Sequence, residues 1–202
     1  MIVKSQRQRK IFFDGNSLSN FAGGSVANGF EYPMSAYTSL TVGTRPVFHP
    51  CGVGSKRTAT LTTDFLTKIL PLSAPNDIVV FMEITNESRD GLAAQTMIDN
   101  VQAYCLQARS YGLKVIVCTC PAGKLSGDPA DTVTRELAAN VILRATWSTF
   151  ADKLADVGAV TQFDSQADIT NTTYYNADQL HLTSAGYVLV ANAVYPQIQT
   201  LL

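Results

Sequence analysis

Charged side chains are scarce in this sequence, and no charge of one sign dominates. Only 15% of its 202 residues are charged, and the formal net charge is −1. A chain with so little net charge has no overall field to draw it to nucleic acid or to an anionic membrane. Its basic run Arg7–Lys10 is short, and we expect it to be a solvated lead-in to a strand. Neutral polar ligands are the partners that this composition favours.

Long apolar runs are also missing. No stretch approaches the roughly 20 apolar residues that a membrane-spanning helix requires. Near the N-terminus only Ile11–Phe13 separate the basic residues from Asp14, which is too short for the core of a signal peptide. We therefore expect no membrane span and no export signal, as in a protein made in the cytoplasm, including one that is delivered on a virion.

Cysteines are too few and too irregularly spaced for a disulfide framework or a metal centre. The four are Cys51, Cys105, Cys118 and Cys120. Cys118 and Cys120 share one face of a predicted strand, but a gap of two residues along a strand disfavours a disulfide. No further ligands stand at metal-binding spacing. We expect buried thiols in a reducing compartment, with no metal and no organic cofactor.

Strand-like and helix-like patterns alternate along the chain, without a repeat or a linker. Apolar strands that alternate with helices form a mainly parallel sheet covered on both faces. We therefore predict one α/β domain over residues 1–202, a three-layer α/β/α sandwich around five strands. The predicted strands are Lys10–Asp14, Pro46–His49, Asp77–Ile84, Leu113–Cys120 and Ala159–Phe163. The predicted helices are Pro33–Leu40, Thr62–Leu70, Gly91–Tyr111 (with Gly112 as C-cap), Asp131–Val157 and Ser184–Leu202 (with Thr183 as N-cap).

Polar or glycine-rich turns follow the first three predicted strands, where ligands of parallel sheets bind. Ser17 stands in a tight turn after the first strand, beside backbone N–H groups that can hold an anion. Gly52 and Gly54 follow the second strand and let the backbone approach a ligand closely. Asn86 follows the third, where its amide can point at a developing oxyanion. Each turn alone is more often an ordinary connection.

The sequence has only two histidines, so few side chains can act as a base near neutral pH. Asp178 precedes His181 by three residues, and in a turn its carboxylate can reach the Nδ1–H of that imidazole. Nε2 of His181 is then left to accept a proton. His49 is the competing base, but Pro50 follows it and no acid is paired with it. For His49 a place in the lining of the pocket is the preferred interpretation.

Together these turns resemble the four sequence blocks of the SGNH (GDSL-like) hydrolases, in the same order. Asp14–Leu18 resembles the first block, with Asn16 where that family often has Asp. Gly52–Ser55 resembles the second, and Asp178–Tyr187 is a very good match to the last. The third block departs from the usual Gly-Thr-Asn-Asp, because this chain has Ile84–Glu87 there. The resemblance runs through nearly the whole chain.

The resemblance implies a flavodoxin-like fold and a serine esterase that needs no cofactor. Ser17 would be the nucleophile, His181 the base and Asp178 the residue that orients it. The oxyanion would be held by the N–H of Ser17, the N–H of Gly54 and the side chain of Asn86. The N–H of Ser55 is an alternative to that of Gly54. The side chains expected to contact substrate are those of His49, Ser55 and Glu87.

The nearest rival fold is that of the α/β-hydrolases, but their Gly-x-Ser-x-Gly elbow lacks its second glycine here, where Ser19 stands. For the substrate we favour O-acetyl groups on carbohydrate, because Ser35–Ser39 and Thr172–Asn176 are polar and aromatic. A lipid esterase or lysophospholipase and a thioesterase are the alternatives within this family. A non-catalytic glycan-binding or virion module is the alternative from another class, and the altered third block would suit it.

Overall fold

A computed structural model of the chain describes residues 7–19 and 46–202. At its centre lies a five-stranded sheet in the order β2-β1-β3-β4-β5, in which every neighbouring pair is parallel. The strands are β1 (Lys10–Gly15), β2 (Val47–Pro50), β3 (Ile78–Met82), β4 (Lys114–Cys118) and β5 (Lys153–Ala155). This order makes the sheet flavodoxin-like, as the resemblance to the SGNH hydrolases implied.

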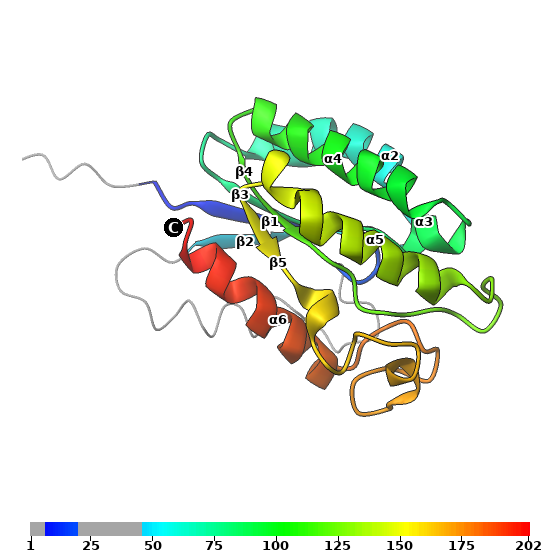
Figure 1. Cartoon of the computed structure of the whole chain (residues 1–202). Coiled ribbons are helices and arrows are strands. Elements are labelled where there is room, and N and C mark those ends of the chain that lie inside the picture. Colours follow the sequence, from blue (N-terminus) through cyan, green and yellow to red (C-terminus); the bar gives the residue numbers. More distant parts are fainter. Residues whose placement is uncertain (1–6, 20–45) are drawn as a thin grey trace, which may run out of the picture.

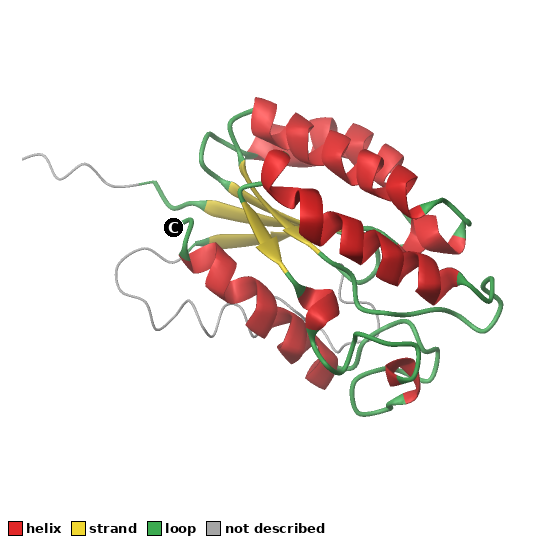
Figure 2. Cartoon of the chain, in the orientation of Figure 1, coloured by secondary structure: helices red, strands yellow, loops and turns green. Residues whose placement is uncertain are grey.

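Helices cover both faces of the sheet and complete the three predicted layers (Figures 1 and 2). Helices α2, α4 and α5 pack side by side over one face, and α6 lies against β4 and β5 on the other. Their bounds are α2 (Thr58–Asp64, continued by a π-helical turn, Phe65–Ile69, and a 3-10 turn, Leu70–Leu72), α3 (Thr85–Arg89), α4 (Ala94–Ser110), α5 (Thr132–Thr146) and α6 (Ser184–Gln199). Single 3-10 turns lie at Trp147–Thr149, Val157–Ala159 and Asp168–Thr170.

Burial explains why the central strands are continuous apolar runs rather than alternating ones. All five residues of β3 are buried, as are Ile11, Phe12 and Phe13 of β1. A strand between two helical layers has no solvent face, so both sets of its side chains are apolar. At about 25 cal/mol per Å² of buried apolar area, these strands contribute a large part of the favourable free energy of folding.

The prediction for the fifth strand was wrong, and so was the C-terminal half of the predicted helix before it. Helix α5 ends at Thr146, and the strand is Lys153–Ala155 instead of Ala159–Phe163. Asp152 ties this segment to β4, because its carboxylate accepts the N–H of Val115 at 2.9 Å. Pairing with the open edge of β4 therefore outweighs a local apolar spacing that suits a helix equally well.

Three smaller predictions are confirmed. Gly112 ends α4 with a φ of 81°, and the side chain of Thr183 accepts the N–H of Gly186 at the start of α6. All four cysteines are free thiols, and the three in α4 and around β4 are buried as predicted, whereas Cys51 is only half-buried. The start of one helix differs from the prediction. Helix α2 begins at Thr58, earlier than predicted.

The predicted helix Pro33–Leu40 lies outside the described residues. Within the described ranges, no helix is both long and apolar enough to cross a membrane.

Candidate active site

The turn that carries Ser17 begins where β1 has no room for a side chain. Gly15 has a φ of 141°, and a Cβ added to it would lie 2.1 Å from the carbonyl oxygen of Met82. Only glycine fits this close approach of two strands. The next residue, Asn16, is buried and accepts the N–H of Leu18 through Oδ1 at 2.8 Å. The exit from β1 is therefore rigid, and Ser17 stands on it partly exposed.

The turn that carries His181 is organised by Asp178. Oδ1 of Asp178 accepts the backbone N–H of Leu180 at 3.0 Å and that of His181 at 2.9 Å. The turn is closed by the N–H of Asn176, which donates to the carbonyl of His181 at 2.8 Å. A side chain that bonds to the backbone two and three residues ahead is a common way to fix such a turn. The second carboxylate oxygen is thereby left to face the imidazole.

The structure brings these two turns into contact at the carboxyl ends of the strands. Nε2 of His181 lies 3.0 Å from Oγ of Ser17, and Nδ1 lies 2.6 Å from Oδ2 of Asp178. Both distances are within hydrogen-bonding reach for a nucleophile, a base and the acid that orients the base. Partial burial acts to raise the pKa of Asp178, but hydrogen bonds from His181 and from two backbone N–H groups hold it below its ordinary value. Asp178 is therefore ionised at neutral pH.

The loop after β2 runs alongside the end of β1 and reaches Ser17. Its backbone is tied to β1, because the N–H of Val53 donates to the carbonyl of Gly15 at 2.9 Å. A Cβ added to Gly54 would lie 3.9 Å from Cβ of Ser17. Ser55 follows with a φ of 62° and marks the sharp bend of the loop. Gly54, the preferred backbone oxyanion donor, therefore stands next to the nucleophile, and the alternative donor, Ser55, follows it in the same loop.

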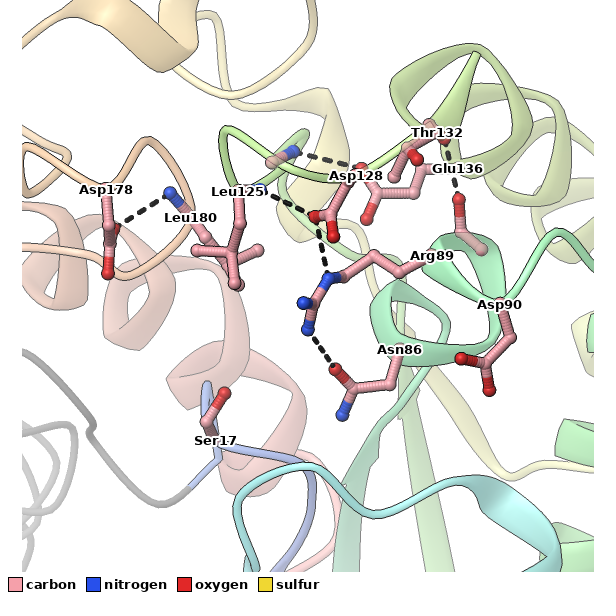
Figure 3. A network of polar contacts seen from close by, with 12 residues as sticks. Ser17, Asn86, Arg89, Asp90, Leu125, Asp128, Thr132, Glu136, Asp178 and Leu180 are labelled. Carbon is pink, nitrogen blue, oxygen red and sulfur yellow. Dashed lines mark hydrogen bonds and ion pairs between the residues drawn. The ribbon is translucent and has the colours of Figure 1, made fainter. Parts of the chain in front are cut away.

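The third predicted turn is the first turn of α3, and hydrogen bonds to several neighbouring groups fix Asn86 there. The backbone N–H of Asn86 donates to Oε1 of Glu83 at 3.1 Å. Its side-chain nitrogen donates to the carbonyl of Lys56 at 2.9 Å, and its Oδ1 accepts from Nη1 of Arg89 at 3.1 Å. Figure 3 shows the amide of Asn86 pointing from α3 toward the side of the site where Ser17 lies.

Comparison with known proteins identifies the fold that carries this site. No family model and no curated protein sequence matches the chain. Among solved structures, a member of the lipolytic G-D-S-L family from Veillonella parvula superposes with a TM-score of 0.76, at 17% identity, over 96% of this chain and 100% of that one. A protein from Slackia heliotrinireducens assigned to the SGNH hydrolases gives a TM-score of 0.66, at 19% identity, over 95% and 100%. This chain has the SGNH hydrolase fold.

A third structure with the SGNH fold is a mutant of an acetyl-xylooligosaccharide esterase from Geobacillus. It superposes on this chain with a TM-score of 0.70, at 14% identity, over 94% of each chain. Identities this low establish the architecture, whereas function depends on the residues of the site itself. The chemistry open to this chain therefore depends on the geometry of Ser17, Asp178 and His181.

Within the SGNH fold, one of the expected substrate contacts, Glu87, lies elsewhere. Glu87 is buried, and its carboxylate accepts the N–H of Thr58 at 3.1 Å and the side-chain N–H of Asn100 at 3.3 Å. It therefore joins α2, α3 and α4, and the prediction that it contacts substrate was wrong. The ring of His49 stacks on Phe12 within the sheet, with centroids 5.0 Å apart. A role for His49 in the pocket stays a prediction.

Tyr175 also differs from the expectation of an aromatic substrate platform. Its ring is buried, and its hydroxyl donates to the carbonyl of Ala122 at 2.7 Å. The neighbouring residues 172–174 remain at least partly accessible. Of the two polar aromatic segments in the prediction, the other, Ser35–Ser39, lies outside the described residues.

Two residues of the site were missed from the sequence, Glu83 and Arg89. Glu83 is buried, accepts from the side chain of Asn16 and from the N–H of Asn86, and so links the serine turn to α3. Burial, reinforced by the nearby Glu87, raises the pKa of Glu83 well above its ordinary value. An acid at the end of an otherwise apolar strand was the signal for Glu83. No sequence signal marks Arg89.

Proposed function

We propose that this chain is a serine ester hydrolase that works through an acyl-enzyme. The observation that carries the proposal is the chain of contacts from Ser17 through His181 to Asp178, with distances of 3.0 and 2.6 Å. A serine hydroxyl is a weak nucleophile at neutral pH, and an adjacent imidazole oriented by a carboxylate is what activates it. Asn86, whose amide points toward the side of the site where Ser17 lies (Figure 3), is a suitable donor for the charge that develops in the reaction.

In the proposed reaction, Nε2 of His181 takes the hydroxyl proton as Oγ of Ser17 bonds to the ester carbonyl carbon. The carbonyl oxygen becomes an oxyanion, which accepts hydrogen bonds from Ser17 N–H, from Gly54 or Ser55 N–H, and from Asn86. His181 then returns its proton to the leaving oxygen, and an alcohol departs. Water, deprotonated by His181, then attacks the acyl carbon, and as the bond to Oγ of Ser17 breaks His181 returns the proton to that oxygen and the carboxylic acid leaves. Asp178 stabilises the imidazolium in both halves.

For the substrate we favour small acyl groups, acetyl above all, on carbohydrate hydroxyls. Of the triad, Asp178 lines a cleft of about 730 Å³, and the rest of the lining is mostly polar or small: Lys124, Leu125, Ser126, Gly127, Ala177 and Gln179. Polar walls suit sugar hydroxyls better than a long acyl chain, whose burial needs apolar surface. The Geobacillus acetyl-xylooligosaccharide esterase shares the SGNH fold, which makes such a substrate compatible with this architecture.

The test combines a substrate series with active-site labelling. Initial rates on p-nitrophenyl esters from acetate to palmitate, on a thioester and on acetylated xylan define the acyl and alcohol preferences. We expect the acetate ester and release of acetate from the polysaccharide to dominate. Preference for long chains or for the thioester would instead assign a lipid esterase or a thioesterase, and would contradict the carbohydrate proposal.

Labelling with an organophosphonate tests the catalytic core independently of the natural substrate. The adduct should map to Ser17 by peptide mass, and Ser17→Ala should remain unlabelled and inactive. His181→Ala should lose nearly all turnover, whereas His49→Ala should lose far less, because His49 is expected to line the pocket and not to act as the base. A protein that folds normally but resists labelling and hydrolyses no ester would be a binding module, and the esterase proposal would then be wrong.

A further inference from the structure

Arg89 lies behind Asn86 at the end of α3 and bonds to it directly. Taking the proposed esterase function as given, we propose that Arg89 is a positioning residue. It sets which end of the Asn86 amide, the nitrogen or the oxygen, meets the oxyanion. Nη1 of Arg89 donates to Oδ1 of Asn86 at 3.1 Å. Figure 3 shows the guanidinium between Asp128 and Asn86, on the side of the network that faces Ser17.

An asparagine serves an oxyanion only in one of its two orientations. With the nitrogen forward it donates a hydrogen bond, but after a half-turn of the amide its own oxygen faces the oxyanion and repels it. Here each end of the amide has a partner of fixed polarity. Arg89 is only a donor and holds Oδ1, while the carbonyl of Lys56 is only an acceptor and holds the nitrogen at 2.9 Å. The nitrogen has a second hydrogen, which is left for the oxyanion.

Arg89 is itself held in place from the opposite side. Its Nε lies 2.7 Å from Oδ2 of Asp128, and the same oxygen accepts the backbone N–H of Leu125 at 2.6 Å. The side chains of Arg89 and Asp128 are 22% and 10% exposed, so water competes little for these contacts. The planar fork of arginine suits this bridge, because one nitrogen meets the carboxylate while another meets the amide.

The charge of Arg89 also acts on the amide. A cationic donor on the oxygen of an amide polarises it and strengthens the N–H at the other end as a donor. Asp128 compensates the charge of Arg89 in the ground state, so Arg89 is not a free cation beside the neutral amide of Asn86. Arg89 thus acts through Asn86 and need not touch the substrate.

The experiment is a double-mutant cycle on hydrolysis of p-nitrophenyl acetate. Asn86→Ala should lower kcat about 10²–10³-fold, as expected for one oxyanion donor. Arg89→Met should lower kcat about 10-fold with KM changed less than about threefold, because a misoriented donor weakens the transition state more than substrate binding. In the Asn86→Ala background, Arg89→Met should change kcat less than about twofold, because the group through which it acts is gone.

Two further variants separate positioning from stability. Arg89→Lys keeps the charge but cannot span both partners, so its kcat should lie between those of wild type and Arg89→Met. The matched control is Arg144→Met, which removes a comparable ion pair with Asp156 (2.9 Å) at the end of α5 and should leave kcat unchanged. Melting temperatures are recorded for all variants. If Arg89→Met does not fold, Arg89→Lys takes its place in the cycle.

The outcomes distinguish the two proposals. If Asn86→Ala is impaired but the Arg89 variants keep wild-type kcat, the role of Arg89 is wrong and the esterase proposal stands. If the two substitutions multiply in the double variant, Arg89 acts independently of Asn86, and the positioning role is likewise wrong. If wild type hydrolyses no ester and is not labelled at Ser17, the esterase proposal fails and this inference fails with it.

Discussion

Replacing Asp178 by asparagine should separate the two functions of that side chain. Its Oδ1 holds the turn through the N–H groups of Leu180 and His181, at 3.0 and 2.9 Å. Its Oδ2 faces Nδ1 of His181 at 2.6 Å. Asparagine keeps the first oxygen and replaces the second by an NH₂ group. Asp178→Asn should therefore preserve the turn and change only the group that meets the imidazole.

The magnitude follows from the tautomer of His181. An amide NH₂ can only donate, so Nδ1 must accept and the proton moves to Nε2, where it blocks transfer from Ser17. In a buried triad the same change lowers kcat by about 10⁴-fold. The side chain of Asp178 is 39% exposed here, so water can replace it as the acceptor at Nδ1. We expect a loss of about 10²–10³-fold, which corresponds to roughly 3–4 kcal/mol of transition-state stabilisation.

The assay compares kcat for p-nitrophenyl acetate with the rate of phosphonate labelling of Ser17. Both depend on proton transfer to His181, so both should fall together in Asp178→Asn. The melting temperature should change little, because the backbone contacts of Oδ1 remain. Asp178→Ala is the matched control, which removes those contacts as well and should lower both the rates and the melting temperature.

Two results would refute this reasoning. If Asp178→Asn hydrolyses the ester within about threefold of the wild-type rate, the carboxylate does not set the tautomer of His181. If instead Asp178→Asn melts as early as Asp178→Ala, the loss of rate reflects a broken turn rather than a misplaced proton. The free energy of unfolding measured against pH adds a check. Because the pKa of Asp178 is lowered in the folded state, its contribution to stability is present above its ordinary pKa and is lost as the pH falls through the pKa of the folded state.

Three further predictions concern stability and are tested by urea unfolding. Asp14 accepts a hydrogen bond from the hydroxyl of Tyr104, and burial raises its pKa to about 7. Its contribution to stability is therefore fully present below about pH 4 and is lost as the pH rises through 7. Asp14→Asn should therefore gain about 1.4 kcal/mol per pH unit relative to wild type between pH 4 and 7, and a constant difference would contradict this. Gly15→Ala should destabilise by about 3 kcal/mol or more, because its Cβ would overlap the Met82 carbonyl, and a neutral effect would disprove that close approach. Thr183→Ala should lower the free energy of unfolding by about 1 kcal/mol through loss of the α6 N-cap, while Thr183→Ser should not.

The sequence alone was sufficient for the layered architecture and for one half of the site. Buried strands of a parallel sheet must be apolar on both faces, so β3 and β4 stand out as continuous runs. The Asp178–His181 turn was equally predictable, because its contacts span only three residues and follow from local backbone geometry. Ser17 and Asn86 could be nominated because each follows a strand at the edge where ligands bind.

Tertiary structure decided everything that depends on contacts between distant segments. The contact of Ser17 with His181 joins residues 164 positions apart and exists only because the sheet aligns the exits of its strands. The fifth strand was chosen by the open edge of β4, which no local pattern encodes. On α3, Glu87 and Arg89 are only two positions apart but point in different directions. Glu87 points into the helix layer and Arg89 points toward Asn86. Which face of so short a helix meets solvent is set by the elements packed around it, because its own sequence carries too few turns to define a face.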